Sequence, residues 1–113
     1  QYWRDFLGRF LISGDMVYQR VQSLSGGEKT RLALAKLFSQ DINVLLLDEP
    51  TTYLDPKSQQ VLLEALREYK GTLILVSHEP MFVKDLEVDM VLLMPEEKYT
   101  YYSDIYLERV GMM

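Results

Sequence analysis

Two short apolar runs, separated by a helical pattern, constrain the fold of this chain most strongly. Val44–Leu47 and Thr72–Ser77 contain no charged residue, which is typical of parallel strands that are buried on both faces. Between them, Asp55 and Pro56 predict the start of a helix, and the apolar spacing continues it to about Tyr69. A strand, helix and strand of this kind predict a right-handed crossover between two parallel strands.

The rest of the chain predicts further short elements around this unit. In chain order they are an amphipathic helix over 2–12, a helix that begins at Ser25-Gly26-Gly27 and reaches about Gln40, a short helix after Pro80, strands at Met90–Met94 and Lys98–Tyr102, and a last helix at Ile105–Val110. The composition changes near residue 41 from helical to α/β. We therefore expect an α/β fold with two parts, residues 1–40 and residues 41–113.

Composition excludes several classes of protein. The 113 residues are enough for one domain, and the net charge of −5 disfavours a surface that binds nucleic acid. The chain has no cysteine, which excludes disulfides and thiolate metal sites and is compatible with the cytoplasmic location that we expect. No apolar run approaches the roughly 20 residues that span a bilayer. Because Gln1 is not an initiator Met and no signal region follows, we expect a piece of a longer protein.

Two adjacent carboxylates follow the first apolar strand. Asp48 and Glu49 come at its carboxyl end, where open α/β sheets bind their ligands. One carboxylate there can hold Mg²⁺, and the next can orient and deprotonate a water molecule. The competing interpretation is a pair of solvated acids at the end of a strand.

A glycine turn and a single histidine add two weaker signals. Ser25-Gly26-Gly27 offers a hydroxyl, backbone N–H groups and a helix N-terminus, which together can bind an anion. An ordinary capped helix would have the same sequence. His78 follows the second strand and could hydrogen-bond a phosphate, although a lone histidine is more often structural. The chain contains no Gly-x-x-x-x-Gly-Lys-Ser/Thr loop.

Four stretches together resemble the motifs of ABC ATPases, in the order that the family has them. They are the signature motif at Leu24–Glu28, the Walker B strand at Leu45–Glu49, the D-loop at Leu54-Asp55 and the switch-histidine region at Ser77-His78. The flanks Phe10–Asp15 and Glu28–Leu37 resemble the ABC-F subfamily, soluble twin-cassette ATPases known as translation factors and as ribosome-protection or antibiotic-resistance proteins. The resemblance covers nearly the whole chain and implies part of a P-loop-NTPase-type core, preceded by the end of a helical subdomain.

The resemblance also implies a role for individual residues. Asp48 would help to hold Mg²⁺, Glu49 would be the general base, His78 would contact the γ-phosphate of ATP, and a nucleotide-binding set would comprise Ser25, Gly26, Gly27, Glu28 and Asp55. Of that set, the first three would bind ATP held by a second, head-to-tail cassette, and Asp55 would communicate across the cassette dimer. The ribosome is a further expected partner of the parent protein.

Three other interpretations of the chain's function stay open. The chain could belong to the nucleotide-binding subunit of an ABC membrane transporter, to a non-catalytic ABC-like interaction module, or to an unrelated Mg²⁺-dependent hydrolase. Without the phosphate-binding loop, we expect the 113-residue chain alone neither to bind ATP tightly nor to hydrolyse it. We also expect its uncovered apolar surface to favour self-association.

Overall fold

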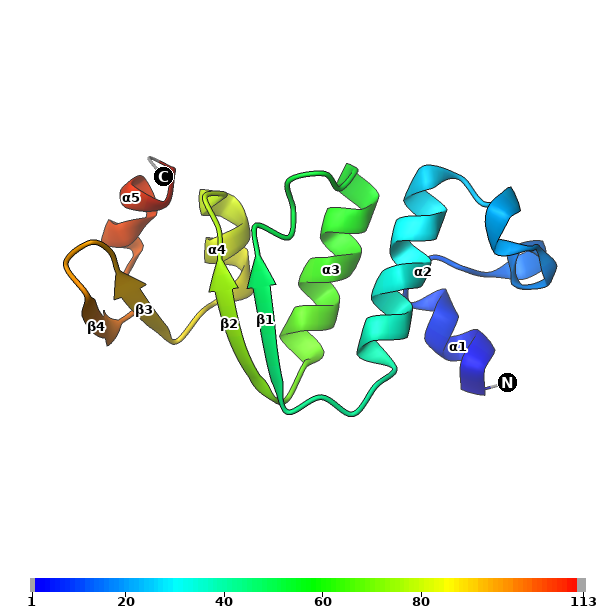
Figure 1. Cartoon of the computed structure of the whole chain (residues 1–113), viewed down its shortest axis with the longest axis horizontal. Coiled ribbons are helices and arrows are strands. Elements are labelled where there is room, and N and C mark those ends of the chain that lie inside the picture. The colour runs from blue at the N-terminus through cyan, green and yellow to red at the C-terminus, as the bar shows by residue number, and fades with distance from the viewer. Residues whose placement is uncertain (1, 112–113) are drawn as a thin grey trace.

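The computed structural model describes residues 2–111 and shows an elongated α/β arrangement (Figure 1). Its principal extents are 50 × 25 × 18 Å and its radius of gyration is 15.9 Å, against about 13 Å for a typical domain of 100 residues. The elements therefore lie in a row rather than around one centre. None of the helices within residues 2–111 is long and apolar enough to cross a membrane.

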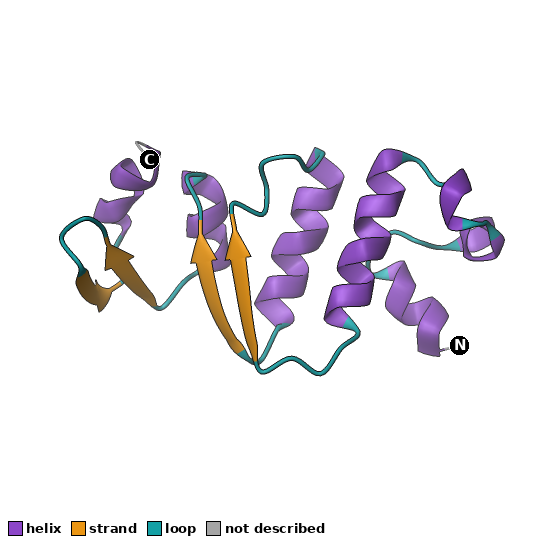
Figure 2. Ribbon diagram, viewed as in Figure 1, coloured by secondary structure: helices purple, strands orange, loops and turns teal. Residues whose placement is uncertain are grey.

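The centre of the row is the predicted strand–helix–strand unit (Figure 2). Strand β1, Val44–Asp48, pairs in parallel with β2, Thr72–Val76, and helix α3, Pro56–Glu68, connects them. The register runs from Val44 opposite Thr72 to Asp48 opposite Val76. The parallel pairing predicted from the two apolar runs is confirmed, and both strands end at the same edge of the sheet.

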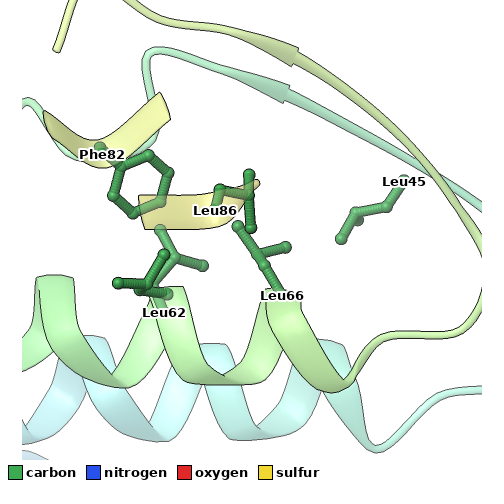
Figure 3. Close-up of a cluster of buried hydrophobic side chains, with 6 residues drawn as sticks. Leu45, Leu62, Leu66, Phe82 and Leu86 are labelled. Atoms are coloured by element: carbon green, nitrogen blue, oxygen red, sulfur yellow. The ribbon is translucent and has the colours of Figure 1, made fainter. Parts of the chain in front are cut away.

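Helices α3 and α4, Pro80–Leu86, form the core with one face of this sheet. Leu45 of β1 packs in one cluster with Leu62 and Leu66 of α3 and with Phe82 and Leu86 of α4 (Figure 3). Alternate strand residues point to the same face, so the other members of this face pack against the cluster as well; they are Leu47, Leu73 and Leu75.

The opposite face of the sheet is open to solvent. Val44 is 54% exposed, Leu46 69%, Ile74 54% and Val76 45%. The prediction that both strands are buried on both faces is therefore wrong for the described residues, because α3 and α4 pack against one face alone. The expected uncovered apolar surface is confirmed by the same side chains, while self-association stays a prediction.

Residues 2–40 are largely helical, but they are less regular than the sequence suggests. Helix α1 covers Tyr2–Gly8, shorter than the predicted 2–12, and the chain then turns so that Phe10 and Ile12 are buried. Two 3₁₀ helices that were not predicted follow, at Gly14–Tyr18 and Val21–Ser23. Helix α2, Gly26–Phe38, ends close to its predicted limit.

Helix α2 packs beside α3 across the expected boundary at residue 41. Ala35 of α2 lies in a second core cluster with Val61 and Ala65 of α3 and with Phe10 and Ile12. Small residues at the centre of this cluster allow the two helices to approach closely. The division into 1–40 and 41–113 stays a proposal about domain organisation.

The C-terminal part forms a separate hairpin. Strand β3, Met90–Leu93, pairs antiparallel with β4, Lys98–Tyr101, and this sheet is distinct from the β1–β2 pair. Both strands match their predicted positions to within a residue. The predicted last helix is instead a 3₁₀ turn, Asp104–Tyr106, followed by α5, Leu107–Gly111.

Candidate functional site

The predicted site residues gather along one side of the molecule. The carboxyl ends of β1 and β2 and the amino ends of α2 and α3 lie on the same side (Figure 1). This placement follows from the parallel register, in which Asp48 is opposite Val76, so that Glu49 and His78 leave neighbouring strand ends. Parallel α/β sheets carry their ligand sites at this edge.

Glu49 and His78 meet directly at this edge. Glu49 Oε2 lies 2.6 Å from His78 Nδ1 and accepts a hydrogen bond of 3.2 Å from the backbone N–H of His78. The backbone N–H of Glu49 donates to the carbonyl of Val76 at 2.7 Å, which extends the strand pairing by one residue. The structure thus brings together the two residues for which a catalytic role was predicted.

The backbone of Glu49 has an unusual conformation. Its φ of 49° lies in the left-handed region, which non-glycine residues enter at an energetic cost. Such conformations persist where surrounding contacts hold them, and they concentrate at functional sites. Here the contacts to Val76 and His78 hold the backbone and the carboxylate in place, with the Glu49 side chain 29% exposed.

The carboxylate of Glu49 also sets the charge of the histidine. Its hydrogen bond, and then its negative charge, raise the pKa of His78 above the ordinary value of 6.5, and Glu79 adds a smaller effect of the same sign. The imidazole therefore stays protonated to a higher pH than a free histidine. With the His78 side chain 42% exposed, this edge of the sheet presents a solvent-accessible imidazole beside the carboxylate that raises its pKa.

Asp48 is the remaining candidate at this edge. It is the last residue of β1 and its side chain is exposed. Within residues 2–111, no group of three or more His, Cys, Asp or Glu side chains is arranged to hold a metal ion. Mg²⁺ does not need such a group, because it keeps several waters and is commonly bound by one or two carboxylates together with phosphate oxygens; the exposed carboxylate of Asp48 is one donor of that kind.

The glycine turn forms a well-defined helix start. Ser25 Oγ accepts from the backbone N–H of Glu28 at 3.2 Å, and the backbone N–H of Ser25 donates to Glu28 Oε1 at 2.9 Å. This reciprocal capping box fixes the first turn of α2. Ser25 and Gly26 are exposed, so a ligand can approach the turn, and Glu28 has a structural role in shaping it.

Asp55 is placed beside this turn rather than beside Glu49 and His78. It is the N-cap residue of α3, as predicted, although its side chain makes no capping hydrogen bond. Its Oδ2 lies 3.7 Å from Nη1 of Arg31. The Ser58 hydroxyl is the largest cause that lowers the pKa of Asp55 below its ordinary value, and the charge of Arg31 contributes a smaller part.

Three buried polar residues near Asp55 were not predicted from the sequence. Arg31 is 8% exposed, Thr51 2% and Ser58 fully buried. A signal for two of them exists in the helical spacing. Arg31 precedes buried Ala35 by one turn in α2, and Ser58 precedes buried Val61 by one turn in α3, so each lies on the inward face of its helix.

Comparisons with known proteins identify the family to which the chain belongs. The family model for ABC transporters matches residues 3–52, which include the glycine turn and both strand-end acids. The chain is 49% identical over 108 residues to YdiF of Bacillus subtilis, whose name describes an ATP-binding protein; the match covers 94% of this chain and 17% of that relative. It is 43% identical over 102 residues to YheS of Haemophilus influenzae, also named for ATP binding, with 90% and 16% covered.

One plant relative is named for the F subfamily. ABC transporter F family member 2 of Arabidopsis thaliana is 49% identical over 80 residues, which cover 71% of this chain and 12% of that protein. The fold and these matches identify the chain as part of an ABC ATPase domain. Within that family, the chain is ABC-F-like. It spans less than a fifth of the length of each of these three relatives.

Proposed function

We propose that this chain contributes the water-activating half of an ATP hydrolysis site to its parent protein. The observation that carries the proposal is the contact of 2.6 Å between Glu49 Oε2 and His78 Nδ1 at the carboxyl edge of the parallel strands. Three features support it: the left-handed backbone of Glu49, the exposed Asp48 beside it, and the similarity to ATP-binding proteins.

In this proposal Glu49 is the general base. Its Oε2 is engaged by His78, which leaves Oε1 to accept a proton from the attacking water. A base within hydrogen-bond reach of the water it deprotonates contributes on the order of 10²–10⁴-fold to the rate. The backbone contact of Glu49 to Val76 limits movement of the carboxylate during that step.

His78 and Asp48 have complementary charges in the same proposal. Glu49 holds Nδ1 of His78, so Nε2 is the ring nitrogen available to donate to a γ-phosphate oxygen. The raised pKa favours the protonated ring, which suits an anionic substrate. Asp48 would hold Mg²⁺, and that ion would neutralise charge on the phosphates of ATP.

The glycine turn would serve a different ATP molecule from the one at Glu49. We propose that Ser25, Gly26 and Gly27 face the γ-phosphate bound by a second, head-to-tail cassette, with the backbone N–H groups of the α2 N-terminus as donors. The exposure of Ser25 and Gly26 supports this. Asp55 would communicate between the two cassettes. A role at the ribosome stays an expectation drawn from the ABC-F resemblance.

The test compares two glutamine substitutions in the full-length protein that contains this chain. Glu49→Gln should reduce ATP turnover on the order of 10²–10⁴-fold and leave Mg-ATP binding intact, because the water loses its base. Glu87→Gln is the matched control, since Glu87 is an exposed glutamate with a similarly left-handed backbone, at φ 59°. Turnover and binding are measured by phosphate release and by titration calorimetry.

The turnover of the two variants distinguishes a catalytic role of Glu49 from general damage to the fold. Loss of turnover in Glu49→Gln with normal turnover in Glu87→Gln supports the proposal. Near-normal turnover in Glu49→Gln refutes the role of Glu49, and equal losses in both variants would mean that the loss reflects general damage to the fold.

A further inference from the structure

Arg31 is a buried cation that the catalytic proposal does not use. It lies in α2, and its side chain is 9% exposed. Its Nη1 is 3.4 Å from the hydroxyl of Ser58 and 3.7 Å from Oδ2 of Asp55, both in or next to α3. A guanidinium removed from water needs such partners, because an unpaired buried charge is strongly destabilising.

The glycine turn lies directly against this pair. A Cβ atom added to Gly27 would meet Arg31 Nη1 at 3.2 Å and the two carboxylate oxygens of Asp55 at 3.4 and 3.5 Å. The first of these distances is shorter than most real Cβ contacts. Gly27 therefore allows the ion pair of Arg31 and Asp55 to sit beside the backbone of the turn.

Asp55 is in turn connected to the base Glu49 by a short, tied loop. The carbonyl of Glu49 accepts a hydrogen bond of 3.4 Å from the backbone N–H of Thr52. The side-chain amide of Gln59 donates to the carbonyls of Thr51 at 3.4 Å and of Leu54 at 3.0 Å. The buried position of Thr51 holds this loop further. A displacement of Asp55 would therefore move the loop and, through it, the backbone of Glu49.

We propose that Arg31 is a positioning residue, which holds the glycine turn of α2 in register with Asp55 and the loop that leads to Glu49. This inference rests on the proposed function, because the two features that it aligns are the turn for one ATP and the base for another. The alternative is that Arg31 merely stabilises the packing of α2 on α3. A structural role of that kind lowers stability without changing the turnover number of folded protein.

The test is a double-substitution cycle in the full-length protein, with Arg31→Met, Asp55→Asn and the two combined. Arg31→Met should lower kcat by up to about 100-fold and leave KM for ATP within about twofold. Displacement of the glycine turn or of Glu49 would slow the hydrolysis step without weakening the initial binding of ATP. The combined variant should be no slower than the slower single variant, because both substitutions break the same link.

Two further variants keep the result interpretable. Arg31→Lys retains the charge without the planar fork and should recover part of the lost kcat. Arg9→Met is the matched control, because Arg9 forms an exposed ion pair with Glu68 that also joins α3 to the helical part; its kcat should be unchanged. If Arg31→Met fails to fold, as thermal unfolding would reveal, Asp55→Asn and Arg31→Lys still test the link, since the Asp55 side chain is 44% exposed.

Two results would contradict the positioning role of Arg31. An unchanged kcat in folded Arg31 variants, or losses that multiply in the combined variant, would overturn the inference. Glu49→Gln in the same series identifies which claim has failed. If it abolishes turnover while the Arg31 variants remain active, the positioning role alone is wrong. If Glu49→Gln turns over ATP normally, the proposed function fails and this inference fails with it.

Discussion

The unequal faces of the central sheet give a quantitative prediction for two leucines. Leu62 of α3 is 1% exposed within the cluster that covers one face, whereas Leu46 of β1 is 69% exposed on the other. Substituting each by alanine removes the same atoms from opposite sides of the same sheet. The two variants therefore make the same substitution at a buried and at an exposed position, so that a difference in their stability reflects burial.

The expected loss at Leu62 can be worked from its burial. Alanine lacks roughly three methylene equivalents of leucine, each of which contributes about 0.8 kcal/mol when buried, so transfer alone gives about 2.4 kcal/mol. The cavity left behind adds to this, and core leucine-to-alanine substitutions cost about 2–5 kcal/mol. We expect about 3 kcal/mol for Leu62→Ala and less than about 0.5 kcal/mol for Leu46→Ala.

Urea unfolding followed by far-UV circular dichroism measures both values. For a urea dependence of about 2 kcal/mol per molar, Leu62→Ala should lower the unfolding midpoint by about 1.5 M, and Leu46→Ala should leave it almost unchanged. Equal losses would refute the assignment of an open face. If the loss in Leu46→Ala grows with protein concentration, light scattering should show the self-association expected of this surface.

Two further predictions concern the site. Ser25→Ala removes the hydroxyl of the capping box and should lower the unfolding free energy by about 1 kcal/mol, whereas Ser25→Asp should retain most of it; thermal unfolding compares them. For pH, the folded-state pKa of His78 is raised above 6.5 by Glu49, so the pair's contribution to stability is complete below pH 6.5 and is lost as pH rises through the higher folded value. Unfolding midpoints measured from pH 5 to 9 should show this decline in the wild type but not in His78→Gln, and parallel profiles would refute it.

The sequence predicted the central unit well, because its signals are local. The uncharged run at Val44–Leu47 and the Asp55-Pro56 helix start depend on neighbouring residues, and both appear in the structure at their predicted positions. The approach of Glu49 to His78 follows from the parallel pairing, since parallel strands that end together bring their next residues to one edge.

Other features depend on contacts between distant segments and left little trace in the sequence. Phe10 and Ile12 continue the apolar spacing of α1, yet the chain leaves the helix before them, with Leu11 at φ 62°. Their burial against Ala35 and Val61 favours the turn over another helical turn. The open face of β1 and β2 could not be inferred from uncharged runs alone, because a run of apolar residues does not say how many layers cover it.

The contact between α2 and α3 changes character along its length, and this change bears on the proposed mechanism. At its centre, Ala35 packs with Val61 and Ala65, and such apolar contacts fix the distance between helices without choosing one register strictly. At the end nearer the site, Arg31 donates a hydrogen bond to Ser58 and forms an ion pair with Asp55, and hydrogen bonds are directional. The apolar part therefore holds the helices together, while the polar part sets where the glycine turn stands relative to Glu49. A substitution at the polar end should thus change the position of the glycine turn relative to Glu49 more than it weakens the packing of α2 on α3. Turnover rather than stability is therefore the decisive measurement for Arg31.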